Sequence, residues 1–200
     1  MTQWPVTLHS RDDRQPQMTL RPLTMRDRAG WDVVRKENAE HVGQWEPTAP
    51  DGTGRRITFR QYVRGLDAEA KAGRILPFVI EVEGGIAGQM HLFGIVQGSL
   101  LSGAAGYWVT RRHAGRGLAT RALGLLCDYA FSSAGLHRVE VNIRPENAAS
   151  LRVVEHLRFR DEGVRLRYLH INGGWRDHRT FALTGEDLLG RTISERWKQQ

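Results

Sequence analysis

Residues 107–120 read YWVTRRHAGRGLAT, and this stretch decides the fold. The apolar residues 107–109 predict the end of a strand, and Leu118 opens a stretch with helical spacing. Between them, Gly115 and Gly117 let the backbone curl tightly, because glycine has no Cβ to restrict it. The sequence therefore predicts a strand, a tight turn and a helix whose first backbone N–H groups are free.

The predicted turn has the features of an anion site. Free N–H groups and the positive end of the helix dipole attract negative charge, and Arg111, Arg112 and Arg116 add full positive charges nearby. A pyrophosphate fits such a turn. The turn lacks the three glycines of a dinucleotide fingerprint and the Gly-Lys-Ser/Thr ending of a nucleoside triphosphate loop. A solvated turn with basic neighbours is the alternative that this stretch alone leaves open.

Helical and strand periodicities continue on both sides of the turn. Apolar residues recur at three- and four-residue steps over 115–131, which predicts a helix, and alternate over 139–143, which predicts a half-buried strand. Upstream, Gly84-Gly85 between apolar runs predicts a tight hairpin. The other expected elements are helices at 24–38, 58–72 and 147–157, a strand at 105–109, a loop at 41–56, and a hairpin at 159–183 turned at Asn172-Gly173.

Two ordered motifs resemble signatures of a known family. Arg112, Gly115 and Gly117, followed by Leu-Ala-Thr, resemble the Gln/Arg-x-x-Gly-x-Gly/Ala signature of the GNAT N-acetyltransferases. The segments LHRVE at 136–140 and RPENAAS at 144–150 resemble the second signature of the RimJ/RimL-like subgroup, which includes ribosomal-protein-alanine N-acetyltransferases. The resemblance extends over residues 18–184.

The resemblance implies an α/β (α+β) GNAT fold. Its mixed, strongly twisted sheet would have six to seven strands and about four flanking helices, and would splay open between its fourth and fifth strands, here 105–109 and 139–143. We expect the acetyltransferase domain at 18–184, a flexible polar arm at 1–17, and a peripheral helix or tail at 185–200 that packs on the domain or on a partner, so that a homodimer stays open.

The resemblance also implies acetyl-CoA as co-substrate. Its pantetheine arm would pair with the main chain of Trp108 and Val109 as an added strand. Asn147 would hydrogen-bond this arm, and Ser150 would lie near the sulfur. The pyrophosphate would bind the turn and the first turn of the helix, at Arg112, Ala114, Gly115, Arg116, Gly117, Leu118, Ala119 and Thr120.

In the family that the chain resembles, the amine attacks the thioester directly, without a covalent enzyme intermediate. By this resemblance the Val109 amide is the candidate oxyanion donor and Ser150 the candidate acid. Some relatives are thought to use a glutamate as base at the position that Leu169 occupies here, so we take Glu46 or His170 as candidates for the base. Cys127 lies within a predicted helix and is interpreted as a packing residue.

Two further positions depart from the family or bear on the acceptor. Arg158 stands where relatives usually have a glycine after the short helix, and we expect this to affect the helix cap rather than the chemistry. Trp45 and Glu46, in the loop 41–56, and Tyr168 are candidate acceptor-binding residues; an ordinary surface loop is the alternative.

The acceptor class follows from ionisation. An α-amino group has a pKa of ~7.7 to 8.0 and a lysine one of ~10.4, so the α-amine is neutral far more often at pH 7. A poorly defined base therefore favours a protein N-terminus as acceptor. A small-molecule amine, and a non-catalytic CoA-binding module, are the alternatives.

Composition limits the other classes. The chain has 200 residues and a formal charge of +7, which favours a polyanionic partner, but its arginines lack the interleaved aromatics of a nucleic-acid surface, so we do not expect nucleic acid. A single cysteine excludes an intrachain disulfide, and we expect no metal. We see no signal peptide or membrane segment and predict a cytoplasmic protein.

Overall fold

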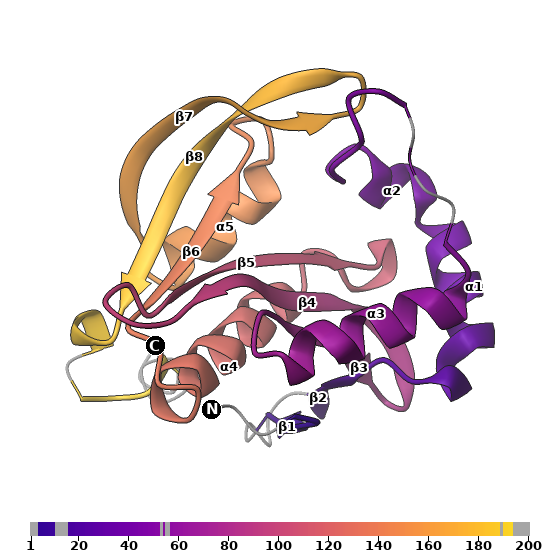
Figure 1. Ribbon diagram of the computed structural model, residues 1–200, viewed down its shortest axis with the longest axis horizontal. Coiled ribbons are helices and arrows are strands. Elements are labelled where there is room, and N and C mark those ends of the chain that lie inside the picture. Colours follow the sequence, from indigo (N-terminus) through magenta and orange to yellow (C-terminus); the bar gives the residue numbers. More distant parts are fainter. Residues whose placement is uncertain (1–3, 11–15, 53, 55–56, 189, 194–200) are drawn as a thin grey trace.

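The computed structural model describes residues 4–10, 16–52, 54, 57–188 and 190–193. One eight-stranded sheet runs through them in the order β1-β2-β3-β4-β5-β6-β8-β7 (Figure 1). The strands are β1 (Leu8–His9), β2 (Met18–Pro22), β3 (Leu76–Val82), β4 (Gly85–Val96), β5 (Ser102–Val109), β6 (Arg138–Ile143), β7 (Arg160–Ile171) and β8 (Gly174–Thr184).

The sheet opens between β5 and β6, as predicted. These two strands run parallel and pair only at Ser102↔Arg138, Gly103↔Val139 and Ala104↔Glu140, and all other neighbouring strands are antiparallel. Beyond Ala104, β5 continues to Val109 beside β4 without a partner on its other side. Figure 1 shows β6 turning away from β5 towards the β7–β8 hairpin.

Helices cover both faces of the sheet. The helices of the described residues are α1 (Arg28–Glu37), α2 (Ala39–Gly43), α3 (Phe59–Lys71), α4 (Leu118–Ser132) and α5 (Ala148–His156), with single 3-10 turns η1 (Met25–Asp27), η2 (Arg111–His113) and η3 (Glu186–Leu188). Side chains alternate across β3, so that Val79 packs with Trp31 of α1 and with α3, whereas Phe78 and Ile80 join the larger core under α4 and α5.

The sheet has more strands than the six to seven expected, because part of the predicted arm is ordered against the domain. Leu8 and His9 pair with β2. Trp4 packs on Phe78 with ring centroids 5.6 Å apart, and its Nε1 donates to Asp67 at 3.1 Å. Apolar side chains among the polar ones of this segment therefore reach the core, and the fold begins before residue 18.

Two smaller segments also differ from expectation. The predicted loop 41–56 begins inside α2, and the predicted C-terminal helix starts as the turn η3. Leu188 and Ile193 are buried against the domain, and the Ile193 N–H donates to Asp128 Oδ1 at 2.7 Å. Leu189 and Trp197, which the expected tail helix would contain, lie outside the described residues.

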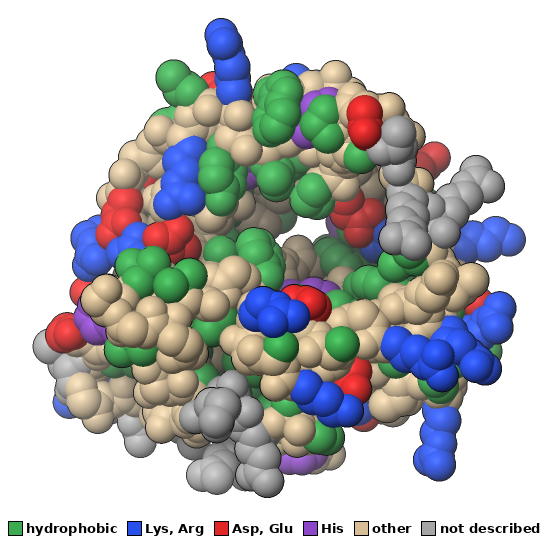
Figure 2. Space-filling model, viewed as in Figure 1, with side chains coloured by type: hydrophobic (Ala, Val, Ile, Leu, Met, Phe, Trp, Pro, Cys, Tyr) green, Lys and Arg blue, Asp and Glu red, His purple; other side chains and the backbone are tan. Residues whose placement is uncertain are grey.

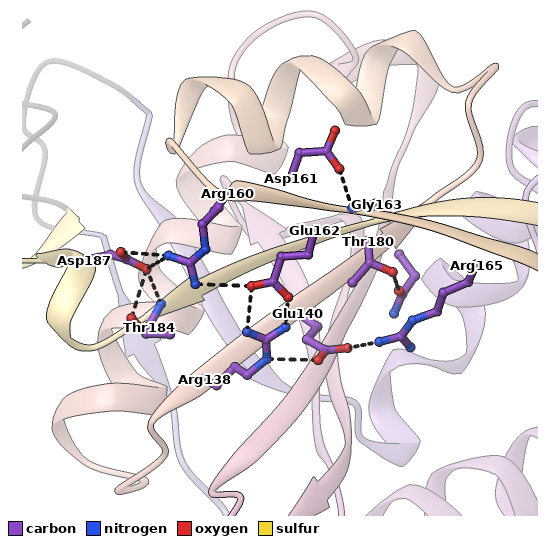
Figure 3. Close-up of polar contacts among 11 residues, drawn as sticks. Arg138, Glu140, Arg160, Asp161, Glu162, Gly163, Arg165, Thr180, Thr184 and Asp187 are labelled. Atoms are coloured by element: carbon purple, nitrogen blue, oxygen red, sulfur yellow. Dashed lines mark hydrogen bonds and ion pairs between the residues drawn. The ribbon is translucent and has the colours of Figure 1, made fainter.

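A charged network anchors the root of the β7–β8 hairpin (Figure 3). Arg138 of β6 bonds Glu140 at 2.9 Å and also Glu162 of β7. Arg165 of β7 donates to the same Glu140 at 2.9 Å. These contacts hold the root of the hairpin on β6, while its far end projects towards α2 (Figure 1).

Candidate active site

The glycine turn adopts the open conformation that the sequence predicted. Gly115 and Gly117 both have φ of +72°, in the left-handed region that glycine occupies without strain. Gly117 is the N-cap of α4, and no side chain caps this end. The first N–H groups of α4 therefore have no partner within the helix and face outwards, which creates a site for an anion.

Asn38 holds the start of this turn in place. Its side chain is buried, its Oδ1 accepts a hydrogen bond from the Arg111 N–H at 2.8 Å, and its Nδ2 donates to Val34 O at 2.8 Å. The residue thus ties the end of α1 to η2. This role could not be predicted from the sequence, because an asparagine at the end of a helix indicates a cap and gives no sign of a partner so distant in the chain.

The free edge of β5 presents backbone groups to the gap beside β6. The Thr110 N–H donates to Ala87 O on the β4 side at 2.8 Å. Because N–H groups alternate along a strand, the N–H groups of Val109 and Tyr107 face away from β4, into the gap. An extended ligand can therefore add to this edge as a further strand, through Tyr107 and Val109 instead of the expected Trp108 and Val109, because the Trp108 N–H faces β4.

A cavity of about 630 Å³ joins the glycine turn, the gap in the sheet and the predicted acceptor loop. Figure 2 shows it as a hollow through the face of the molecule, below the β7–β8 hairpin. The structure brings most of the predicted site residues to this cavity, namely Trp45, Glu46, Trp108, Val109, Ala114, Gly115, Gly117, Leu118, Ala119, Thr120, Asn147, Ser150 and Tyr168.

Three predicted residues are not among those that line the cavity. Arg112 and Arg116 are exposed on the turn beside it. His170 hydrogen-bonds Thr48 instead: its Nδ1 lies 2.9 Å from Thr48 Oγ1, and its carbonyl oxygen accepts from the Thr48 N–H at 2.9 Å. With the bridge between Pro47 and Ile171, these bonds join the acceptor loop to the hairpin, which closes the ring around the hollow.

Arg35 anchors the predicted acceptor loop beside the cavity. It forms a two-pronged ion pair with Glu46, at 2.6 and 2.8 Å, and lies over the Trp108 ring with its guanidinium carbon 5.4 Å from the centroid. Trp45 is covered in the same way by Arg144, at 5.2 Å. Both predicted acceptor residues of the loop therefore have fixed cationic partners.

Asn147 and Ser150 meet at the start of α5. The Asn147 Oδ1 accepts from the Ser150 N–H at 3.1 Å as the helix N-cap, which leaves its Nδ2 available to a ligand. The Tyr107 side chain lies beside Ser150 in the cavity wall. Burial raises the pKa of Tyr107 well above its usual value, while the neighbouring Ser150 reduces this effect, so Tyr107 stays protonated at neutral pH.

Histidines are the most numerous titratable groups among the described residues that line the cavity. Five of them line the cavity: His41, His91, His113, His156 and His178. Burial lowers the pKa of His91 to about 4, and burial with Arg112 and Arg116 lowers that of His113. Their shared position is visible only in the structure, because they come from five separate elements of the fold.

The cavity is poor in negative charge. Among the described residues that line it, Glu46 supplies the only carboxylate, against two arginines, Arg144 and Arg152.

Cys127 is fully buried in α4, and burial raises its pKa well above the usual value, which agrees with its interpretation as a packing residue. No cluster of three His, Cys, Asp or Glu side chains suited to a metal occurs within the described part of the chain, and no helix there could span a membrane.

These features fit acetyl-CoA. The bare amides of the glycine turn suit its pyrophosphate, and the free edge of β5 suits an extended pantetheine arm between β5 and β6. Tyr107, Asn147 and Ser150 lie along the same cavity, where the thioester end of that arm would be held.

Comparisons with known proteins agree with this fit. The family model described as Acetyltransferase (GNAT) domain matches residues 17–160. The structure of Mycobacterium smegmatis RimJ in complex with CoA-disulfide matches with a TM-score of 0.88 and 37% identity, over 98% of this chain and 95% of that one. The probable N-acetyltransferase YjcK of Bacillus subtilis (strain 168) is 32% identical, over 84% of this chain and 94% of its own.

Two further relatives differ in acceptor. The [Ribosomal protein uS5]-alanine N-acetyltransferase of Escherichia coli (strain K12) is 28% identical, over 80% of this chain and 85% of its own. The spermidine N(1)-acetyltransferase of the same organism is 30% identical, over 50% of this chain and 53% of its own. The fold, the site and these matches together show that the chain belongs to the GNAT acetyltransferase family and is an acetyl-CoA-dependent N-acetyltransferase.

Proposed function

We propose that the acceptor is the α-amine at the N-terminus of a protein. The observation that carries this proposal is the charge of the cavity: among the described residues that line it, Glu46 supplies the single carboxylate, and Arg35 already holds it. A polyamine carries several positive charges and needs several carboxylates to bind it, whereas a chain terminus brings a single amine on an otherwise neutral backbone.

Ionisation supports the same acceptor. An α-amine has a pKa of about 7.7 to 8.0, against about 10.4 for lysine, so its neutral, nucleophilic form is roughly a hundredfold or more abundant at pH 7. The cavity offers histidines rather than a free carboxylate to accept a proton. Such groups suit an amine that is already close to losing its proton.

Residues of the chain would take the following parts. When bound, acetyl-CoA supplies the activated acetyl thioester. The Val109 N–H, which is directed into the gap, is the candidate donor to the acetyl oxygen as negative charge develops there. The Ser150 hydroxyl, beside Tyr107, is the candidate to protonate the departing sulfur. Trp45, Glu46 and Tyr168 form the acceptor side of the cavity.

The second candidate is a small-molecule polyamine, which the match to the spermidine enzyme favours. A thiol-release assay with acetyl-CoA separates the two. The acceptors are a peptide with a free N-terminus and acetylated lysines, the same peptide with a blocked N-terminus and free lysines, and spermidine. We expect kcat/KM for the first to exceed the other two roughly a hundredfold, with mass spectrometry placing the acetyl group on the α-amine. A faster reaction with spermidine or lysine would overturn the proposal.

A further inference from the structure

His178 lies on β8 at the acceptor end of the cavity. Its side chain lines the cavity together with Arg144, Tyr168 and Leu169, although only 3% of the residue is exposed. The sequence-based candidates for a base, Glu46 and His170, did not include it. A buried imidazole in the wall of a substrate cavity points to a specific role, because burying a polar ring costs free energy unless its nitrogens have partners.

One ring nitrogen of His178 is fixed by the backbone. Its Nδ1 lies 3.0 Å from the carbonyl oxygen of Arg176. A carbonyl oxygen only accepts hydrogen bonds, so Nδ1 carries the proton, and in the neutral ring Nε2 keeps its lone pair. Nε2 has no hydrogen-bond partner among the described residues. The ring thus offers the cavity a proton acceptor in a single tautomer.

The orientation of the ring is fixed as well. Tyr168 packs edge-on against it, with centroids 5.5 Å apart and an interplanar angle of 69°. Tyr168 is in turn covered by Arg165, whose guanidinium carbon lies 5.0 Å from the ring centroid. Arg165 belongs to the charged network at the root of the hairpin (Figure 3). The imidazole is therefore held before a substrate arrives, as a proton acceptor must be.

The surroundings keep His178 neutral. Burial lowers its pKa below the ordinary 6.5, and the positive charge of Arg144 acts in the same direction. The bond to the Arg176 carbonyl and the charges of Glu146 and Asp177 oppose this shift without reversing it. At pH 7 the ring is therefore mainly unprotonated.

The two residues predicted as bases are already engaged. Glu46 accepts hydrogen bonds from both terminal nitrogens of Arg35, at 2.6 and 2.8 Å, so both of its carboxylate oxygens are already engaged. The His170 side chain bonds Thr48 outside the cavity lining.

The other cavity histidines are less well placed for the acceptor. His113 is bonded to Thr110 in the glycine turn, His91 lies under the gap on β4, and His156 is exposed at the end of α5. The ring of His41, in α2, has no hydrogen bond among the described residues to fix its tautomer. His178 alone combines burial, a fixed tautomer and a position beside the acceptor residues.

We propose that Nε2 of His178 accepts the proton that the acceptor amine loses, directly or through one water. The amine nitrogen forms the new amide bond, the carbon–sulfur bond breaks, and the sulfur gains a proton for which Ser150 is the candidate donor. His178 then returns its proton to water, and Ser150 regains from water the proton that it gave to the sulfur. This role deepens the proposed function, since it concerns the proton of the amine, but it holds for any amine that the enzyme acetylates.

The test compares His178→Gln and His178→Ala with His9→Gln, which changes an exposed histidine on β1, far from the cavity in the fold. The acceptor is whichever amine of the panel above reacts fastest with the unchanged enzyme, so failure of the α-amine proposal leaves this test standing. We expect both His178 variants to lose about a hundredfold or more in kcat and His9→Gln to lose nothing. CoA affinity by calorimetry should stay within about twofold of that of the unchanged enzyme, because His178 lies away from the glycine turn.

A merely structural role for His178 would not change the pH dependence. In the unchanged enzyme, log kcat/KM should rise with pH with a slope near two at low pH, because both His178 and the amine must lose a proton. The slope should fall to near one in His178→Gln, and free imidazole should restore part of the activity of His178→Ala. A variant with kcat within about threefold of the unchanged enzyme, or an unaltered slope, would overturn the proposal.

A measurement on the unchanged enzyme guards against variants that fail to fold. Long-range ¹⁵N–¹H spectra at pH 7 should show His178 neutral, with its proton on Nδ1. A proton on Nε2, or a charged ring, contradicts the proposal whatever the variants do.

Discussion

Glu46 illustrates how a partner decides what a side chain can do. Its carboxylate forms an ion pair with Arg35 at the entrance to the acceptor side of the cavity. We predict that Glu46→Gln raises KM for the acceptor, because the loop loses its anchor, but leaves kcat within about threefold and the pH profile unchanged. Steady-state kinetics between pH 5.5 and 9 check this. A loss of about a hundredfold in kcat, as expected on removing a general base, would restore Glu46 as the base.

His91 makes stability depend on pH. Its pKa is about 4 in the fold against 6.5 for an ordinary histidine, because burial disfavours the charged ring. Unfolding lets the ring take up a proton below pH 6.5, so the free energy of unfolding should fall between pH 6.5 and 4. The loss of unfolding free energy from this residue should be at most about 3 kcal/mol.

Urea unfolding at pH 7 and pH 4.5 measures this effect. His91→Gln should be less stable than the unchanged protein at pH 7 but should lose less stability on acidification. An equal loss in both proteins would show that His91 does not titrate on unfolding.

At the scale of elements, the join between β4 and β5 depends on Gly88. A Cβ at this position would lie 2.3 Å from Trp108 O, a backbone atom that cannot move without parting the two strands. We predict that Gly88→Ala destabilises the protein by about 3 kcal/mol. Gly65→Ala is the matched change, because Gly65 is exposed inside α3 with nothing within 4 Å of an added Cβ. It should stabilise the protein by about 0.5 to 1 kcal/mol, and urea unfolding of both variants tests the contrast in sign.

The free edge of β5 gives a residue-by-residue prediction for hydrogen exchange. The amides of Tyr107 and Val109 face the gap, whereas those of Gly106 and Trp108 face β4. Saturating CoA should slow exchange at Tyr107 and Val109 by about tenfold or more, equivalent to about 1.4 kcal/mol, and change the other two much less. Equal protection of all four amides would argue for a general stiffening of the strand instead of an added partner.

At the scale of the molecule, the candidate active site lies where two half-sheets separate. β1 to β5 carry the glycine turn, β6 to β8 carry the cavity wall that contains His178, and only three residue pairs of β5 and β6 join the two halves. The charged network on β6 and β7 and the bond between Thr48 and His170 hold the hairpin at its two ends. The hairpin beside the hollow in Figure 2 is thus held in position by contacts that lie outside the cavity.

Local sequence patterns predict the parts of the fold that depend on short stretches of chain. The glycine turn, the order of strands and helices, and the opening between β5 and β6 depend on short stretches with strong periodicity or on motifs resembling a family. Contacts between segments that are distant in the chain leave no such pattern in the sequence. Asn38 accepts a hydrogen bond from Arg111, and His178 lines the same cavity as Trp45. The strand β1 was not predicted because it is too short: a few apolar residues within a polar segment show no strand periodicity.

The central claim is that the bare amides before α4 bind the pyrophosphate of CoA, and calorimetry of CoA binding to two alanine variants tests it most directly. Gly117 and Gly135 have φ of +72° and +68°, and a Cβ at either meets nothing within 4 Å, so Gly117→Ala and Gly135→Ala should each cost about 1 to 2 kcal/mol of stability. Only Gly117 lies in the turn. We predict that Gly117→Ala weakens CoA binding by about tenfold or more, while Gly135→Ala binds CoA as the unchanged protein does. Equal affinity in both variants would contradict the account.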